Sequence, residues 1–252
     1  MLGKIRIVLM ETSHPGNIGA VARAMKNMDI SSLYLVSPRA MPDDSSFGRA
    51  AGASDILDSL VLVDSLQKAV EGCGLVVGAS ARNRRIPWPV MNPRDCAKEV
   101  LAKAAVTDVA LVFGREDRGL SNDELQQCNF HVHIPANPDF SSLNLAMAVQ
   151  VICYEVRMAF LSMLDGVDNG SSIASIRGAK DQGWDELPAT ADELEGFFDH
   201  LERTVKSTGF LDPENPRQLM SRLRRLFLRA DIDKVELNIL RGILTSVDKL
   251  FK

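Results

Sequence analysis

Five short apolar runs, separated by segments with helical spacing, constrain the fold of this chain more than any other feature. The runs occupy residues 5–10, 33–36, 75–78, 109–113 and 131–134. Near-continuous apolar strands that alternate with helices indicate a parallel sheet covered on both faces. The last helix of this part begins near Ser142 and continues through Phe160. We therefore expect an α/β fold, a parallel sheet flanked by helices, over residues 1–164.

The composition changes after the last of these helices. Residues 165–184 are rich in glycine and serine and hold few large apolar side chains, which is typical of a flexible linker. From residue 185 to 252, apolar residues recur at helical spacing in three segments, which start near Thr190, Pro216 and Asp233. We expect a small all-helical C-terminal extension, whose length limits the size of its own core.

Basic residues are concentrated in two places, although the net charge of the chain is −4. Binding of nucleic acid depends on a local patch, so the net charge neither identifies nor excludes such a partner. The extension holds a run without acidic residues, which contains Arg217, Arg222, Arg224, Arg225 and Arg229. A second basic group consists of Arg82, Arg84 and Arg85. The basic run in the extension either binds RNA or forms the solvated face of an amphipathic helix.

Composition argues against secreted and membrane proteins. The four cysteines are scattered and form no C-x-x-C pair, so neither a disulfide framework nor a cysteine metal site is expected. The first residues alternate in polarity and are too few for a signal peptide, and no apolar run approaches the length of a membrane span. We expect a cytoplasmic protein with no membrane partner.

Metal and dinucleotide chemistry also lack support in the sequence. His131 and His133 alternate on one strand, but no third ligand candidate accompanies them, so we expect no metal site. The first strand is not followed by G-x-G-x-x-G, and the chain has no Walker A sequence. A Rossmann dinucleotide site and the glycine-rich loop of the commoner methyltransferase fold are therefore not indicated.

The first of three informative segments spans residues 17–25. Asn17 suits the N-cap of a helix, and Gly19 and Arg23 lie four residues apart on one helical face. A glycine inside a helix costs about 1 kcal/mol relative to alanine. Either a ligand approaches the backbone beside the guanidinium of Arg23, or Gly19 packs tightly against a strand and Arg23 is a solvated charge.

The second segment, residues 111–121, places a charged loop at the end of a strand. Gly114 permits close approach or a positive φ, and Ser121 with Glu124 has the spacing of a capping box, so a helix starts there. Ligands in open α/β sheets bind at the carboxyl edge of the strands. The loop containing Arg115 and Glu116 is therefore either a ligand-binding loop or a solvated turn whose charges pair with each other.

The third segment, residues 134–144, is a constrained loop with two prolines that leads into a helix near Ser141 and Ser142, where Ser142 suits an N-cap. A fourth segment, residues 78–82, also follows a strand. Trp88 lies beyond it and is either a stacking surface for a base or a core residue beside two prolines.

Together and in this order, the three segments resemble the signature motifs of the SPOUT methyltransferases, trefoil-knotted enzymes that methylate RNA with S-adenosylmethionine. Their span covers about half of the chain. The resemblance implies a C-terminal trefoil knot in the α/β part, which composition alone does not predict because knots are rare. It also implies a homodimer whose active site draws on both subunits.

The resemblance assigns roles to residues at the motif positions. Glu116 would hold its loop together. Contacts to S-adenosylmethionine would come from Ala79, Ser80, Ala81, Gly114, Ile134, Ser141, Ser142 and Leu143. The catalytic residues would be Arg23, Ser142 and Asn144. We expect RNA contacts from Arg82, Arg84, Arg85, Arg115, Arg222 and Arg225.

Within this family, the chain most resembles the TrmJ branch. The resemblance rests on residues 7–19 and 111–121, and the helical extension adds weaker support. That branch methylates the ribose 2′-oxygen in the anticodon loop of tRNA, which implies cytidine or uridine at position 32 of the tRNA as the target. The alternatives are another tRNA or rRNA site, or a non-catalytic RNA-binding protein of the same fold. Arg23 would act either as the base or as a clamp on a phosphate, since a guanidinium with a pKa above about 12 is a poor base.

Overall fold

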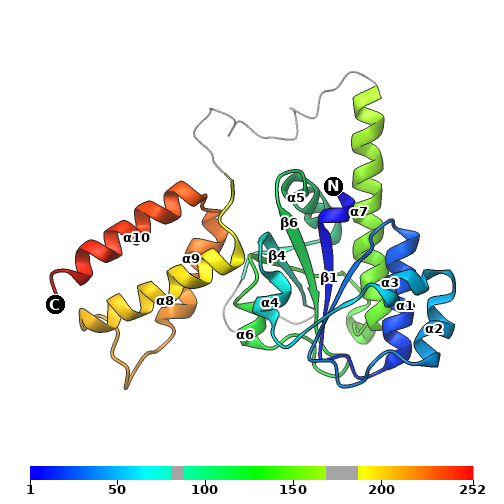
Figure 1. Ribbon diagram of the computed structural model, residues 1–252, viewed down its shortest axis with the longest axis horizontal. Coiled ribbons are helices and arrows are strands. Elements are labelled where there is room, and N and C mark those ends of the chain that lie inside the picture. The colour runs from blue at the N-terminus through cyan, green and yellow to red at the C-terminus, as the bar shows by residue number, and fades with distance from the viewer. Residues whose placement is uncertain (81–87, 169–186, 252) are drawn as a thin grey trace.

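A computed structural model describes residues 1–80, 88–168 and 187–251. Its centre is a seven-stranded sheet in the order β3-β2-β1-β6-β4-β7-β5, in which every pairing is parallel (Figure 1). The strands are β1 (Ile5–Met10), β2 (Ser32–Val36), β3 (Val61–Val63), β4 (Cys73–Ala79), β5 (Val90–Met91), β6 (Asp108–Phe113) and β7 (Phe130–Val132). The predicted parallel sheet is confirmed, and the short strands β3 and β5 were missed. The trefoil knot stays a prediction.

Helices precede or follow almost every strand. The α-helices of the first part are α1 (Pro15–Asn27), α2 (Asp44–Ala50), α3 (Ser54–Asp58), α4 (Leu66–Val70), α5 (Pro93–Ala104), α6 (Asn122–Leu125) and α7 (Leu145–Asp168). Three short 3-10 helices are η1 (Leu2–Lys4), η2 (Ala51–Ala53) and η3 (Pro138–Phe140). Helix α7 continues past the predicted domain boundary at residue 164. The rest of the predicted linker, from residue 169, lies outside the described residues, as do Ala81, Arg82, Arg84 and Arg85.

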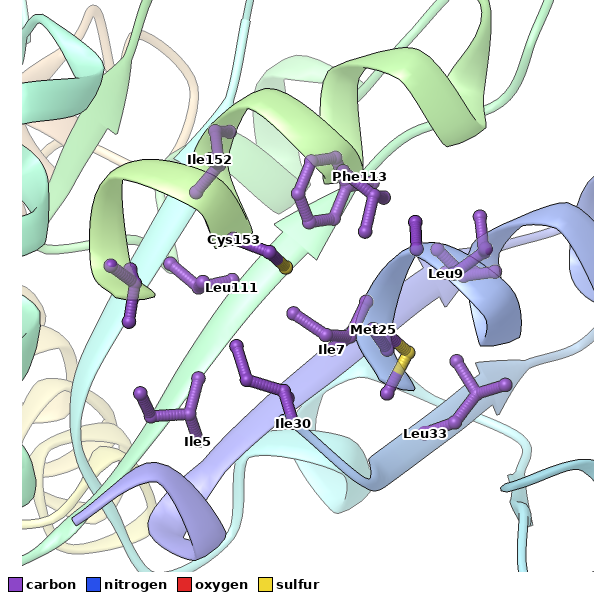
Figure 2. Packing of buried hydrophobic residues seen from close by; sticks show 14 of the residues in the cluster. Ile5, Ile7, Leu9, Met25, Ile30, Leu33, Leu111, Phe113, Ile152 and Cys153 are labelled. Atoms are coloured by element: carbon purple, nitrogen blue, oxygen red, sulfur yellow. The ribbon is translucent and has the colours of Figure 1, made fainter. Parts of the chain in front are cut away.

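Alternating side chains of the strands supply two apolar layers. On one face, Ile5, Ile7 and Leu9 of β1 pack with β6 beneath α1, α5 and α7, and Figure 2 shows Met25 and Cys153 pointing into this layer from two of these helices. On the other face, Val8 and Met10 pack beneath α4 and α6. The sheet is therefore covered on both faces, as the apolar strands predicted.

The extension consists of α8 (Ala191–Ser207), α9 (Leu219–Ala230) and α10 (Lys234–Asp248), which share an apolar cluster of their own. It lies against the α/β part rather than apart from it (Figure 1). The Asp192 carboxylate accepts a hydrogen bond from the Gly72 amide at 3.0 Å, and Lys103 forms an ion pair with Asp231 at 2.5 Å.

Trp88 belongs to this junction. Its side chain is only 7% exposed within the apolar cluster of the extension, and its indole Nε1 donates to the carbonyl of Cys128 at 2.8 Å. The hypothesis that Trp88 offers a stacking surface to RNA is wrong, because the side chain is buried inside the protein. The alternative, a core residue, is confirmed.

Helix α7 meets the length and hydropathy of a membrane-crossing helix over Leu145–Leu164. The expectation that no apolar run approaches this length was therefore wrong. One side of the helix, including Val149, Ile152 and Val156, is fully buried against the sheet. Such burial is typical of the core helix of a globular domain. A core helix of this kind can have the same length and hydropathy as a membrane-crossing helix.

Close packing of α1 on α2 explains the glycine in the first motif. A β-carbon built at Gly19 would overlap the backbone carbonyl of Ser46 in α2. The Ser46 hydroxyl also donates to the carbonyl of Pro15 at 2.7 Å, which fixes the two helices together. The hypothesis that a ligand approaches this glycine is wrong. The packing alternative is right in kind, although the neighbour is a helix and not a strand.

We predict that Gly19→Ala lowers the stability of the protein by about 1–3 kcal/mol, because the added methyl group must displace the Ser46 backbone. Thermal unfolding monitored by circular dichroism measures the effect. Gly48→Ala in α2 is the matched control, since a β-carbon there meets nothing within 4 Å. An alanine at that helical position should be neutral or slightly stabilising. Equal melting temperatures for Gly19→Ala and wild type would contradict the packing argument.

Candidate active site

The second, third and fourth segments meet at a cavity of about 160 Å³ at the carboxyl ends of β4, β6 and β7. Parallel strands place their carboxyl ends on the same edge of the sheet, so loops far apart in sequence become neighbours. The cavity is lined by these residues predicted to contact the cofactor: Ala79, Ser80, Gly114, Ile134, Ser141, Ser142 and Leu143. Ala81, the remaining one, lies outside the described residues. The structure thus brings the predicted set together, while its role in binding stays a prediction.

The loop after β6 folds back on itself. The amide of Gly119 donates to the carbonyl of Arg115 at 2.9 Å, and Gly119 adopts a φ of +70°. A β-carbon built at Gly114 would overlap the backbone of Gly119 and Leu120. Gly114 is therefore required by the packing of its own loop, and its predicted contact with the cofactor stays a prediction. A larger residue would disrupt the loop itself.

Arg115 holds this loop through two carboxylates. Its guanidinium donates to Glu11, which follows β1, and to both oxygens of Glu124, at 2.9 Å each. The hydrogen bonds from Arg115 and Arg39 lower the pKa of Glu11 to about 2. The side chain of Arg115 is only 9% exposed. We therefore withdraw Arg115 as an RNA contact, because its charge is neutralised inside the protein.

The helix start predicted after this loop is confirmed. The Ser121 hydroxyl accepts from the Glu124 amide at 3.2 Å, and the Glu124 carboxylate accepts from the Ser121 amide at 2.7 Å, which completes a capping box. Burial alone would raise the pKa of Glu124, but hydrogen bonds from Arg115 and Ser121 outweigh it, so the pKa is lowered. Glu124 thus stays ionised and serves both the helix and Arg115.

Glu116 connects the second motif to the first. Its carboxylate accepts from Asn17 Nδ2 at 3.0 Å and from the Ser13 amide and hydroxyl at 3.3 and 3.2 Å. Burial opposes ionisation of Glu116, but these hydrogen bonds prevail and lower its pKa. The prediction that Glu116 holds its loop together agrees with this geometry. A fixed negative charge therefore lines the cavity.

Asn17 is not an N-cap. Helix α1 begins at Pro15, with His14 as the N-cap residue, so Asn17 lies inside the first turn with only 8% of its surface exposed. Its Oδ1 accepts a hydrogen bond from Asn144 Nδ2 at 3.2 Å. Asn17 therefore joins the first motif to the third. The sequence did hold a signal for the observed helix start, because proline is favoured at the first position of a helix and Pro15 occupies it.

The start of α7 is also shifted from its predicted position. Asn144 Oδ1 accepts from the Ala146 amide at 2.9 Å, which makes Asn144 the residue that caps α7. Ser142 is exposed and lies before the helix, so the N-cap interpretation of Ser142 is wrong. Ser142 lines the cavity, and Asn144 lies beside it through its bond to Asn17.

Arg23 lies apart from these residues. It is exposed on α1, does not line the cavity, and forms no hydrogen bond or ion pair with another described residue. The three predicted catalytic residues therefore do not converge within one copy of the chain. Arg118, which the sequence analysis did not single out, lines the cavity with a side chain that is 58% exposed.

The two histidines of the β7 segment have structural partners. His131 Nε2 lies 3.1 Å from the carbonyl of Leu125, and His133 Nδ1 lies 3.2 Å from that of Ser80. Among the described residues, no group of three or more potential ligands is arranged to hold a metal ion.

The basic run of the extension is divided between two roles. Arg224 forms a bidentate ion pair with Glu195 at 2.5 and 2.7 Å, and its guanidinium lies 4.5 Å from the centre of the Phe198 ring. Arg222 and Arg229 are exposed on α9, and Arg225 is half-buried. The solvated helix face is thus formed by only part of the run.

The carboxyl edge of this parallel sheet carries a cavity between polar loops that are joined by hydrogen bonds. This arrangement is typical of α/β proteins that bind a small ligand. The model of the SpoU rRNA Methylase family matches residues 4–154, more than half of the chain. The chain therefore belongs to the SpoU methylase family. A second model, the C-terminal domain of the tRNA methyltransferase TrmJ, matches residues 192–252.

Relatives with similar sequences span nearly the whole chain. It is 55% identical to a tRNA (cytidine/uridine/adenosine-2′-O-)-methyltransferase TrmJ of Pseudomonas aeruginosa, over 99% of this chain and 96% of the relative. It is 54% identical to a tRNA (cytidine/uridine-2′-O-)-methyltransferase TrmJ of Salmonella choleraesuis, over 99% and 98%. Among solved structures, TrmJ from Z. mobilis matches with a TM-score of 0.79 and 30% identity, over 96% of this chain and 98% of that one. The predicted family and branch are confirmed.

We predict that acid destabilises the protein through Glu11. Its pKa is about 2 in the folded protein and 4.5 without partners, so the stability it contributes is present above about pH 4.5 and is lost as the pH falls toward 2. Glu11→Gln should lower the melting temperature at pH 7 and flatten its fall between pH 5 and 3. Glu99→Gln, an exposed carboxylate of α5, is the control. Parallel pH profiles for wild type and Glu11→Gln would contradict the role of this network.

Proposed function

We propose that this protein is a tRNA 2′-O-methyltransferase that uses S-adenosylmethionine. The observation that carries the proposal is the cavity at the carboxyl ends of β4, β6 and β7, where residues of the second, third and fourth segments come together. The names of the full-length relatives support the same reaction and the same class of substrate. From the resemblance of the motifs we further propose the anticodon loop as the site, with cytidine or uridine at position 32 of the tRNA, and the cytoplasm as the location.

The residues of the cavity suit the cofactor. Val132, Ile134 and Leu143 offer apolar contact for an adenine ring, while the serines at residues 80, 141 and 142 and nearby backbone groups offer hydrogen bonds. The ionised Glu116 complements a positively charged sulfonium. At about 160 Å³ the cavity is smaller than common ligand sites of about 300–1,000 Å³. The exposed loop over residues 135–142 borders it, so part of the ligand would lie beneath this loop.

The cofactor supplies an activated methyl group, so the protein must align the ribose 2′-oxygen with it and handle one proton. Ser142 and Asn144 lie at the cavity and beside it, where their side chains can hydrogen-bond the ribose or the departing proton. The bond from Asn144 to Asn17, and from Asn17 to Glu116, holds Asn144 in one orientation.

Arg23 acts on the RNA in this proposal. An exposed guanidinium keeps its proton, so its suitable roles are to bind a phosphate beside the target ribose and to stabilise the developing oxyanion. A role as the base would require Arg23 to lose its proton in the complex. Because Arg23 does not line the cavity of its own chain, it would complete the cavity of a second copy.

A homodimer is the second part of the proposal. Several large apolar side chains of α7 and the loop before it are exposed: Phe140 (79%), Met147 (60%), Tyr154 (47%) and Leu164 (48%). An exposed apolar face on a helix whose other side is core indicates a protein–protein interface. The partner that family resemblance favours is a second copy of this chain.

We predict that Ser142→Tyr weakens S-adenosylmethionine binding more than ~10-fold, since blocking contacts worth only ~1.4 kcal/mol has that effect. The exposed position should accept the larger ring without unfolding, and the ring would enter the cavity. Isothermal titration calorimetry measures the affinity. Asp139→Tyr, exposed in the same loop but outside the cavity lining, is the control. Unchanged affinity in a folded Ser142→Tyr variant would move the cofactor site elsewhere.

We predict that Arg23→Ala loses methyl transfer to tRNA while its affinity for S-adenosylmethionine stays within about twofold of wild type, because Arg23 lies outside the cavity. Arg23→Lys keeps the charge but not the planar fork, and should recover only part of the activity. Transfer of a labelled methyl group to unmodified tRNA measures both. Normal turnover by Arg23→Ala would remove Arg23 from the catalytic site and would favour the reading as a non-catalytic surface charge.

Mixing two inactive variants tests whether the site is shared. A dimer of one Arg23→Ala subunit and one Ser142→Tyr subunit contains one cavity with wild-type Ser142 and one wild-type Arg23, which meet only if Arg23 reaches the partner. Partial recovery of activity on mixing supports the shared site. No recovery, with subunit exchange verified by size-exclusion chromatography of tagged chains, would place Arg23 and the cavity of one chain together.

We predict that Arg222→Ala weakens tRNA binding and lowers the slope of log affinity against log salt by about 1, which is the loss expected for one phosphate contact. The exposed arginine on α9 should contribute little to the chemical step. Filter-binding titrations at several salt concentrations measure the slope. Lys98→Ala, exposed on α5, is the control. An unchanged slope would favour the solvated helix face as the whole role of this part of α9.

A further inference from the structure

We infer that Trp88 is a positioning residue that couples the C-terminal extension to the cofactor cavity. The inference rests on the proposed function, because it takes the cavity at the carboxyl ends of β4, β6 and β7 as the site of S-adenosylmethionine. It adds a thermodynamic link: occupancy of the extension by tRNA and occupancy of the cavity by cofactor favour each other.

Trp88 is the point where the apolar core of the extension reaches the α/β part. The cluster beneath α8, α9 and α10 contains Phe197, Phe198 and Leu228, and Trp88 is its one member from before residue 187 within the described chain. The side chain is 7% exposed. Any shift of the helices relative to the sheet must therefore be accommodated at the indole, because packed interiors leave little free volume.

The indole is tied to β7 on its other side. Its Nε1 donates to the carbonyl of Cys128 at 2.8 Å, two residues before the strand, and its ring stacks on that of His131 at 5.8 Å between centroids with planes 7° apart. The His131 amide donates to the carbonyl of Pro89 at 2.8 Å, and β5, which follows Trp88, pairs with β7. Trp88 thus contacts the ring of the middle residue of β7 and is continuous with the strand that pairs with it.

The residues that follow His131 in the chain form one wall of the cavity. Val132 and Ile134 line it, the Ser80 amide donates to the carbonyl of Val132 at 3.0 Å, and His133 Nδ1 lies 3.2 Å from the carbonyl of Ser80. Ser80 itself lines the cavity. The histidine that Trp88 stacks on is therefore followed directly by a residue of the cavity wall.

Elsewhere, the junction is loosely packed. A cavity of about 330 Å³ lies between the extension and the sheet, lined by Val70 and Asn129 on one side and by Leu194 and Leu228 on the other. The ion pair between Lys103 and Asp231 lies at another point of the junction. An ion pair between partly exposed side chains can persist when the extension moves slightly relative to the sheet. The buried indole, which is both stacked and hydrogen-bonded, cannot move without losing these contacts. Trp88 is therefore where movement of the extension would be transmitted.

The consequence follows from linkage. If tRNA bound to the extension favours the docked arrangement, it also favours the ordered β5–β7 edge and so raises the affinity for the cofactor. By thermodynamic necessity, the cofactor then raises the affinity for tRNA by the same factor. A ligand shifts such an equilibrium only by its differential affinity for the two arrangements. The measurable quantity is the ratio of cofactor affinities with and without tRNA.

The experiment measures this ratio in the full-length protein by calorimetry with S-adenosylmethionine, alone and with saturating tRNA that already carries the 2′-O-methyl group, so that no methyl transfer consumes the cofactor. We expect a ratio in wild type within the usual range for coupled sites, about 5- to 150-fold. Trp88→Leu should bring the ratio close to 1. Trp88→Phe keeps a ring over His131 but loses the Nε1 donor, and should retain part of it. A role in stability alone would lower affinities without changing the ratio.

The control is Asp231→Asn, which removes the ion pair with Lys103 at the same junction but away from β7, and keeps a residue that tolerates the left-handed φ of 56° found there. Its ratio should equal that of wild type. A wild-type ratio of 1, or an unchanged ratio in a folded Trp88→Leu variant, overturns the inference. If Trp88→Leu does not fold, Trp88→Phe decides by the same criterion. Unchanged cofactor affinity in Ser142→Tyr would instead overturn the proposed cofactor site, so the two failures are distinguishable.

Discussion

The carboxylate of Glu116 is the point on which the rest of the site depends. Burial opposes its charge, and three hydrogen bonds from Ser13 and Asn17 outweigh that cost and lower its pKa. Because Asn17 also accepts from Asn144, one ionised group fixes the loops after β1 and β6 and the start of α7. Removal of one partner would leave a half-buried charge or amide unpaired, which is more costly than the bond itself is favourable.

The sequence predicted what depends on local pattern and on general rules of topology. Apolar strands such as residues 5–10 and 109–113 identify themselves by composition, and parallel strands bring their carboxyl ends to one edge. The individual cavity residues came from the resemblance to the family, and the topology explains why loops that follow different strands lie together. The boundaries at Pro15 and Leu145 were missed by two or three residues, since caps compete over short distances.

The errors share a different cause, which is a partner distant in sequence. Gly19 is required by Ser46, and Arg115 is held by Glu11. Trp88 has neighbours on each side, His131 and the helices of the extension, none of which sequence spacing reveals. A residue type restricts the roles that are possible, but only the tertiary contact selects among them. The alternatives that packing supplied were correct for Gly19 and Trp88.

The charges of the extension show how an acidic chain can still present a basic face. Much of the acid in α8 is used within the protein: Glu195 pairs with Arg224, Glu193 with Lys234, and Asp192 accepts from the Gly72 amide. The electric field of such an ion pair is screened within a short distance at physiological ionic strength, so these acids contribute little to the potential farther away. The guanidiniums of Arg222 and Arg229 are exposed on α9. Among the described residues, neither forms an ion pair with a carboxylate. A net charge of −4 is then compatible with a local basic surface, because these acids pair within the protein while Arg222 and Arg229 stay exposed.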